Sequence, residues 1–212
     1  MNLGTTAFNP IGRKVISFCL YGDDDLYVKG IQENAWLAGR VYPGWDVWVY
    51  TDKDITIDGA TVIRCKPHRG HNLMFARFLP AGDPSVSYTI FRDADSRLNV
   101  REKAAVDDWM ARDKAAHVMR DHADHANWPI LGGMWGIRRG YFPNIAQMIG
   151  AWPSHTEKLD DMRFLAEVVY PAIARDCVHH SSVATAIPDA RPWPTHPPFD
   201  GHVGQIIRVD SK

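Results

Sequence analysis

Two acidic residues, two positions apart, offer the clearest chemistry in this sequence. Asp93 and Asp95 directly follow the apolar run 87–91, whose pattern is typical of a buried β-strand. In an extended chain, residues i and i+2 project to the same side, so the two carboxylates converge. Like charges that close repel each other unless a cation lies between them. Because Mg²⁺ and Mn²⁺ prefer oxygen ligands and share them with phosphates, the pair predicts a divalent-metal site, although two aspartates in a solvated loop would give the same pattern.

The segments around this pair predict an α/β domain. Residues 15–20 have the pattern of a strand buried on both faces, and helical spacing follows over 26–38. A β-α-β opening of this kind requires crossover helices and a layered sheet. Ligands of open α/β sheets bind beyond the carboxyl ends of the strands, which is where Asp93 and Asp95 lie. Further strands are expected over 47–50, 61–63, 116–119 and 132–137, and further helices over 100–111, with a capping box of Asn99 and Glu102, and over 160–170, ended or kinked by Pro171.

Composition narrows the class of protein. A chain of 212 residues with 45% hydrophobic and 23% charged residues fits one globular domain. The net charge of −1 gives no general attraction to nucleic acid or to an anionic membrane. No apolar run approaches the roughly 20 residues that span a bilayer, the N-terminus has no signal-peptide core, and the cysteines form no C-x-x-C pair. We therefore expect a cytoplasmic protein whose tryptophans mostly fill its core.

The segment from Phe91 to Leu98, with the sequence Phe-Arg-Asp-Ala-Asp-Ser-Arg-Leu, resembles the D-x-D segment of nucleotide-sugar glycosyltransferases with the GT-A fold. The resemblance implies a Rossmann-like domain with a mixed, mostly parallel sheet flanked by helices. It implies one domain over 1–212, with a nucleotide-binding half at about 15–98 and an acceptor half at about 99–212. Other stretches resemble the same family in the same order, namely 42–45, 49–52, 74–79, 131–136, 161–165, 180–182 and 203–205. Met162 and Ser181 depart from it, because glutamine and an acidic residue are common there.

The resemblance also implies a metal centre and a donor. Asp93 and Asp95 would hold Mn²⁺ or Mg²⁺, which bridges the diphosphate of a nucleotide-sugar, with a UDP-linked hexose as the best match. The third ligand would come from far along the chain, from His180 or, as the alternative, from His202. A neutral imidazole suits Mn²⁺ better than Mg²⁺. For either histidine, a hydrogen-bonded structural role is the competing interpretation.

Transfer of a sugar requires two further functions. Charge that develops on the leaving diphosphate must be neutralised, and Arg77 or Arg92 would assist the metal in this. The acceptor hydroxyl must be positioned or deprotonated, and Asp161 is the candidate, as a base in an inverting enzyme or as a sugar-binding carboxylate in a retaining one. An acidic residue that merely stabilises the start of a helix is the competing interpretation of Asp161.

Four more residues are candidates for contacts with the donor. Tyr21 ends the first strand and would stack on the nucleotide base, and Asp52 after the second strand would bind the base or the ribose. Gly132 and Gly133 would let a sugar approach the backbone closely, although a turn or a bulge would also explain two glycines.

The run 117–125 holds the densest cluster of ionisable residues in the chain. We expect it to border the site, with Asp121 as a second catalytic candidate that contacts the acceptor. A solvated loop and a zinc site that uses His122 and His125 together with Asp121 are the alternatives for this run. The acceptor itself stays open among a glycan, a lipid-linked sugar, a small molecule and a modified nucleobase.

Two other functions compete with sugar transfer. A phosphatase related to the haloacid dehalogenases also carries Asp-x-Asp after a buried strand, but Arg97 stands where threonine or valine is usual there. A sugar- or nucleotide-binding module that has the fold without catalysis is the non-enzymatic alternative.

Overall fold

Seven strands form one sheet in the computed structural model of this chain, which describes residues 11–22, 24–66, 72–183, 187, 189–197 and 201–208. Along the sheet the strand order is β3-β2-β1-β4-β6-β5-β7. The strands are β1 (Arg13–Leu20), β2 (Asp46–Thr51), β3 (Ala60–Arg64), β4 (Val86–Phe91), β5 (Ala116–Arg120), β6 (Trp135–Arg138) and β7 (Cys177–Ser181).

Strand directions explain why distant segments meet at one edge of the sheet. β1 pairs in parallel with β2 and β4, so the residues after β1 and after β4 leave the sheet at the same edge. β6 is antiparallel to β4 and β5, with Phe91 opposite Trp135, so the residues before β6 reach that edge too. β2 pairs in parallel with β3, and β5 with β7. The predicted mixed, mostly parallel sheet is confirmed.

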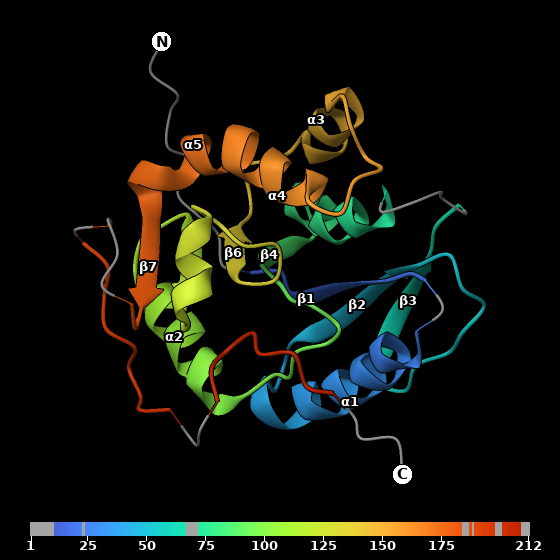
Figure 1. Ribbon diagram of the computed structural model, residues 1–212, viewed down its shortest axis with the longest axis horizontal. Coiled ribbons are helices and arrows are strands. Elements are labelled where there is room, and N and C mark those ends of the chain that lie inside the picture. Colours follow the sequence, from blue (N-terminus) through green and yellow to red (C-terminus); the bar gives the residue numbers. More distant parts are fainter. Residues whose placement is uncertain are drawn as a thin grey trace.

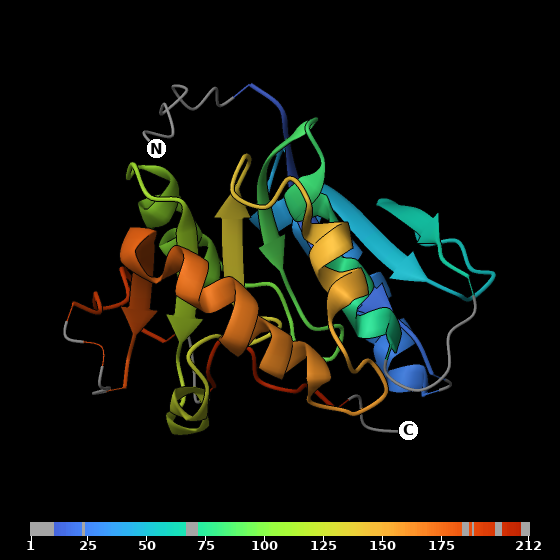
Figure 2. The ribbon, with the colours of Figure 1, turned by 90° about the horizontal axis from the view of Figure 1, so that it is seen from above.

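Helices cover both faces of the sheet (Figure 1). α1 (Asp25–Val41) and α2 (Val100–Met110) lie on one face. The other face carries the 3₁₀ helix η1 (Asn72–Gly82), α3 (Ile145–Ala151) and the helical stretch that begins with α4 (Asp160–Phe164), as the turned view of Figure 2 also shows. The short 3₁₀ helices η2 (Ala123–Asn127) and η4 (Ala174–Asp176) complete the elements. No helix in the described part of the chain is long and apolar enough to cross a membrane.

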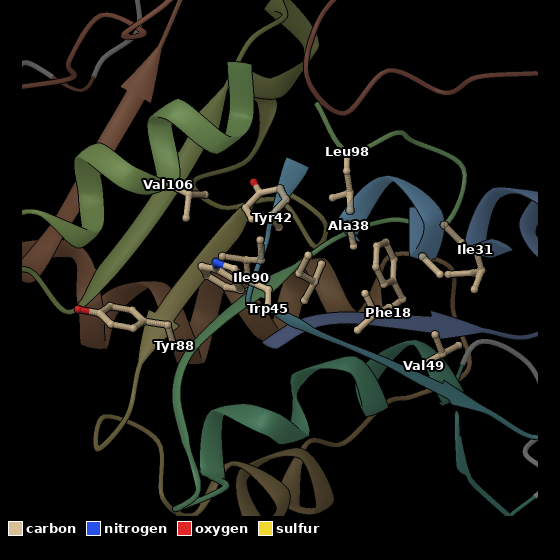
Figure 3. Close-up of a cluster of buried hydrophobic side chains, with 14 of the residues drawn as sticks. Phe18, Ile31, Ala38, Tyr42, Trp45, Val49, Tyr88, Ile90, Leu98 and Val106 are labelled. Atoms are coloured by element: carbon tan, nitrogen blue, oxygen red, sulfur yellow. The ribbon is translucent and has the colours of Figure 1, made fainter. Parts of the chain in front are cut away.

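Two apolar clusters hold these layers together. On the α1 side, Phe18 and Val49 of the sheet pack with Ile31 and Ala38 of α1 (Figure 3). On the opposite side, the cluster combines side chains of η1, β6 and the α4 stretch around the fully buried Trp135. Such burial contributes about 25 cal/mol per Å² of apolar surface, which makes it the main stabilising force. Of the eight tryptophans, Trp45, Trp48, Trp109, Trp135 and Trp193 are buried, Trp128 and Trp152 are half-buried, and Trp36 is exposed.

The helix expected over 160–170 does not end at Pro171. It continues as α4 (Asp160–Phe164), one π-helical turn η3 (Leu165–Val169) and α5 (Tyr170–Ile173). Proline lacks an N–H and its ring clashes with the carbonyl four residues earlier in a regular helix. A wider π turn directly ahead of Pro171 relieves both problems, so the helix passes through the proline.

Capping predictions are confirmed in part. Asn99 caps α2, because its side chain accepts a hydrogen bond from Glu102 N at 3.0 Å. Glu102 does not reach back to Asn99. Its buried carboxylate instead accepts hydrogen bonds from Tyr42 Oη at 2.8 Å and from Arg92 Nε at 3.3 Å. The strand expected over 132–137 begins later, at Trp135, because residues 132–134 form a turn.

Glu102→Ala should destabilise the fold strongly. The side chains of Arg92 and Glu102 are each 2% exposed, and removal of the carboxylate leaves the guanidinium buried without its counter-ion. We expect the free energy of unfolding in urea to fall by about 3–5 kcal/mol. Asp107→Ala on the same helix is the control, because Asp107 is 56% exposed and its ion pair with Lys103 contributes less than about 1 kcal/mol. Equal losses in the two variants would contradict the buried network.

Candidate active site

A pocket of about 460 Å³ opens at the edge of the sheet where β1 and β4 end. Its wall combines segments that are distant in sequence, which the strand directions bring together. They are residues of 19–27, Met74 and Arg77 of η1, residues 93–95, residues of 131–134, residues of 158–162, His125, and Gly204 and Ile206 near the C-terminus. The described lining residues include no tryptophan, and their aromatic rings are those of Tyr21 and Tyr27.

Arg77 is the charged centre of this pocket. Its Nη1 donates a short hydrogen bond to Asp93 Oδ1, and its Nη2 donates to Asp161 Oδ2 at 2.6 Å. The side chains of Arg77 and Asp161 are only 7% and 4% exposed. Burial raises the pKa of Asp161 above its ordinary value, and the neighbouring guanidinium opposes that rise. The ion pairs are therefore what allows these charges to be buried.

The two glycines that precede β6 make room for this arrangement. A side chain on Gly132 would overlap the Arg77 guanidinium and come within 3.0 Å of Asp161 Oδ2. A side chain on Gly133 would overlap the Asp93 carboxylate and lie 2.8 Å from Asp93 N. The sequence predicts that a sugar approaches the backbone at both glycines. In the structure, the side chains of Arg77 and Asp93 lie against these glycines. Gly132 lines the pocket, whereas Gly133 does not.

Asp93 and Asp95 both line the pocket, and the chain between them is held from three sides. Ser96 N and its hydroxyl bond to Asp93 O, while Asn34 Nδ2 of α1 donates to Ser96 O at 2.8 Å. Ile207 N donates to Asp95 O at 2.8 Å, which ties the C-terminal segment, red in Figure 1, to the same turn. Burial, and next the charge of Asp93, raises the pKa of Asp95. A neighbouring like charge disfavours the ionised form of Asp95, and a cation between the two carboxylates would favour it.

The donor set fits a hard divalent cation that shares its ligands with phosphate. The Asp93 side chain is 44% exposed, so it is accessible from the pocket. Among the residues that the structure describes, no group of three or more His, Cys, Asp and Glu side chains is arranged to hold a metal. The protein would therefore supply Asp93 and Asp95, and water or phosphate oxygens would complete the coordination, which is a common arrangement for Mg²⁺.

The structure does not bring His180, the predicted third metal ligand, to the pocket that Asp93 and Asp95 line. His180 lies in β7, is fully buried, and does not line the pocket. Its Nδ1 is 2.8 Å from His117 Nε2, and its Nε2 is 3.2 Å from Asp108 Oδ2. Burial lowers the pKa of His180 to about 4, so the imidazole is neutral. His202, the alternative, does not line the pocket either; its ring stacks on His122 at 4.4 Å between centroids.

Arg92 and Asp121, predicted for donor binding and for catalysis, do not line the pocket and are instead held by buried protein partners. Arg92 is 1% exposed and donates to Glu102 and to the carbonyl oxygens of Phe91 and Trp135. Asp121 accepts two hydrogen bonds from Arg101 at 2.8 and 2.9 Å. It also accepts from Ser182 Oγ at 2.8 Å and from Val203 N at 3.0 Å. Burial acts to raise the pKa of Asp121, but these hydrogen bonds outweigh it and lower the pKa below its ordinary value.

Of the remaining candidates, Tyr21 lines the pocket and Asp52 does not. His125 belongs to the 117–125 run and does line it. Its Nδ1 accepts a hydrogen bond from Asp121 N at 3.1 Å, and burial lowers its pKa to about 4. The zinc interpretation of this run is not supported, because the described residues contain no such ligand group. Lys158 and Tyr27 also line the pocket, and no motif in the sequence marks them.

Comparison with known proteins identifies the fold. No family model matches the sequence, and no curated protein matches it. A glycosyltransferase involved in glycosylation of the major capsid of PBCV-1 superposes with a TM-score of 0.56 at 15% identity, over 80% of this chain and 82% of that chain. The glycosyltransferase GlyE of Streptococcus pneumoniae superposes with a TM-score of 0.51 at 15% identity, over 79% of this chain but 45% of its own length. The fold is that of the GT-A-type glycosyltransferases.

This GT-A-type fold is not confined to sugar transfer. A 4-diphosphocytidyl-2C-methyl-D-erythritol synthase of Anaerococcus prevotii superposes with a TM-score of 0.51 at 11% identity, over 82% of this chain and 88% of that chain. The choice of reaction therefore depends on the side chains of the pocket rather than on the fold.

Arg77→Met should destabilise the protein in a pH-dependent way. Without the guanidinium, the pKa of the buried Asp161 rises further, because only the desolvating surroundings remain. A carboxyl group whose pKa is raised by folding penalises the folded state as the pH rises through that pKa. We expect a loss of about 3–5 kcal/mol in unfolding free energy near neutral pH, which shrinks as the pH falls below the raised pKa toward the ordinary value of a carboxyl group. Urea unfolding at several pH values measures this, with Arg64→Met of the exposed Arg64–Asp54 pair as the control. A loss that does not vary with pH would contradict the assignment.

Gly133→Ala should cost stability, since the new methyl group overlaps Asp93. Overpacking of this kind typically costs about 1–3 kcal/mol. Gly150→Ala in α3 is the matched control, because no atom lies within 4 Å of its new methyl group and alanine favours a helix by up to about 1 kcal/mol. Thermal unfolding of both variants separates the two outcomes. A neutral Gly133→Ala would show that Asp93 is not packed against the glycine.

Proposed function

We propose that this protein transfers a sugar from a nucleotide-diphosphate donor to an acceptor hydroxyl, with a divalent metal ion bound at Asp93 and Asp95. The observation that carries the proposal is the convergence of Asp93, Asp95, Arg77 and Asp161 on one pocket at the carboxyl edge of a GT-A-type sheet. Ligands of open α/β sheets bind at this edge.

The metal ion supplies positive charge to the phosphates of the donor, which makes the diphosphate a better leaving group. Asp93 and Asp95 suit Mn²⁺ or Mg²⁺ because both offer carboxylate oxygens on one short turn. Arg77 contributes by holding Asp93 Oδ1, so the carboxylate keeps one orientation toward the pocket. Preorganisation of this kind avoids reorganisation of the site during the reaction.

Asp161 is the carboxylate that we assign to the hydroxyl chemistry. It lies in the pocket wall and is held by Arg77 at 2.6 Å. A carboxylate in this position accepts a hydrogen bond from a hydroxyl group of the donor sugar or of the acceptor. Its raised pKa favours proton acceptance, which a base requires, and its ion pair favours a fixed orientation, which a sugar contact requires.

The apolar part of the pocket suits a nucleoside. Tyr21 and Tyr27 stand at the end of β1 and at the start of α1, and Met74 lies beside Tyr21, whose hydroxyl is 4.0 Å from Met74 Sδ. Aromatic faces with a polar group at one end stack on nucleobases and still reach water. We assign this region to the base of the donor, with UDP-linked sugars as the first class to test.

A phosphatase mechanism fits the pocket less well. It would require Asp93 as a nucleophile, but the ion pair with Arg77 stabilises this carboxylate and makes it less nucleophilic, whereas a metal ion can still bind the exposed carboxylate. Nucleotidyl transfer is the second candidate, because the synthase from Anaerococcus prevotii shares the fold. The products separate the candidates, since sugar transfer releases a nucleoside diphosphate whereas transfer of a nucleotidyl group to a phosphorylated acceptor releases pyrophosphate.

A thermal-shift screen of nucleotide-sugars with and without Mn²⁺ tests the proposal. Ligand at a hundredfold excess over its Kd stabilises the folded state by about 2.7 kcal/mol, which for a chain of this size raises Tm by about 5–10 °C. We expect such a shift only with metal, and we expect Asp95→Asn to abolish it while the fold is retained. Asp54→Asn is the control, because Asp54 is 98% exposed and outside the pocket. If no nucleotide-sugar raises Tm under any metal condition, the donor assignment is wrong.

A further inference from the structure

The pocket carries more negative than positive charge. Among the described residues, four carboxylates line it, on Asp24, Asp93, Asp95 and Asp161, against the two cations Arg77 and Lys158. His125 adds no charge at neutral pH, because its pKa is lowered to about 4. A nucleoside diphosphate brings further negative charge, so the site needs cations that are free to face the phosphates.

Arg77 is not free to do so. Its two terminal nitrogens are bonded to Asp93 and Asp161, and its side chain is 7% exposed. Both hydrogen bonds are part of the buried network that keeps the two carboxylates in place. Arg77 therefore orients carboxylates, so a cationic side chain that assists the metal ion at the leaving group has to come from elsewhere in the pocket wall.

Lys158 has the opposite properties. It lines the pocket and is exposed, and no ion pair involves it within the part of the chain that the structure describes. It belongs to the loop between α3 and α4, three residues before Asp161. A lysine ammonium on a flexible four-carbon stem reaches phosphate oxygens as a point charge with three donors.

The loop that carries Lys158 is fixed at its base. Asp160 is fully buried and accepts hydrogen bonds from Ser154 Oγ at 2.6 Å, from Glu157 N at 2.9 Å and from Arg163 Nη1 at 3.0 Å. These bonds bracket Lys158 on both sides in sequence. The backbone of the loop is thereby held against the pocket, while the lysine side chain itself has no ion-pair partner among the described residues.

We propose that Lys158 binds the diphosphate of the donor and stabilises it as the leaving group; this inference rests on the proposed function. In glycosyl transfer, the bond between the anomeric carbon and the β-phosphate oxygen breaks, and its electron pair stays on that oxygen. The acceptor oxygen bonds to the carbon, and its proton passes to a base or to solvent. The Lys158 ammonium donates hydrogen bonds to the phosphate oxygens on which the charge increases.

Binding of nucleotides and of nucleosides in the presence of Mn²⁺ tests this role without an acceptor. Titration calorimetry compares UDP with uridine, and GDP, ADP and CDP with their nucleosides. Lys158→Ala should weaken the tightest diphosphate about tenfold, while the affinity for its nucleoside stays unchanged. Lys158→Arg should retain most of the affinity, and Lys158→Glu should lose more than alanine. The loss should also shrink as ionic strength rises from about 0.05 M to about 0.5 M, because salt screens an exposed charge.

Lys29→Ala is the matched control, since Lys29 is exposed on α1 and does not line the pocket. An equal loss of diphosphate affinity in the two lysine variants would assign the effect to the net charge of the protein and would overturn the inference. Unchanged diphosphate affinity in Lys158→Ala would overturn it directly. A parallel loss of nucleoside and diphosphate affinity would show a structural role and would overturn it as well. If the wild-type protein binds no nucleoside diphosphate with Mn²⁺, the proposed function fails first, and the Lys158 role fails with it.

Discussion

The structure around the pocket depends on one buried cation. Arg77 reaches from η1 to Asp93 at the end of β4 and to Asp161 at the start of α4. A guanidinium this far from water is stable only when its charge is compensated and its geometry is fixed. The two glycines before β6 follow from the same constraint, because any side chain there would enter the space of Arg77 or Asp93. Four segments of the chain are thus positioned by one set of charges.

The charged side chains at the centre of the pocket are bonded to one another, whereas two charged side chains at its rim have no such bonds in the described part of the chain. The carboxylates of Asp93 and Asp161 are oriented by bonds that are already made, whereas Lys158 and Asp95 face the pocket without a side-chain partner in the described residues. A site for an anionic, metal-bound ligand needs carboxylates that hold the cation, which Asp93 and Asp95 would supply, and an exposed positive charge that meets the phosphates, which Lys158 would supply. The GT-A-type fold alone does not decide between sugar transfer and other reactions of nucleotides. The side chains that line the pocket therefore determine which reaction occurs.

Residues that look catalytic in sequence also serve the fold. Asp121 stands in the densest ionisable run of the chain, yet it joins Arg101, Ser182 and Val203 N into a buried network. That network fixes the C-terminal segment, from which Gly204 and Ile206 complete the pocket wall. His180 and Arg92 are likewise buried among protein partners. Ionisable residue types alone do not distinguish these roles, because the same groups that bind ligands also satisfy one another inside the protein.

Local patterns in the sequence determined most elements, including the strands at 15–20 and 87–91, the cap at Asn99 and the placement of Asp93 and Asp95 at a strand end. They did so because hydrophobic periodicity and capping depend on neighbours within a few residues. Only the tertiary structure decided that Arg77 holds Asp93 and Asp161, that His180 points into the core, and that Lys158 lines the pocket. Those contacts join residues far apart in the chain, and they follow from strand order and from the compensation of buried charge, neither of which a local pattern records.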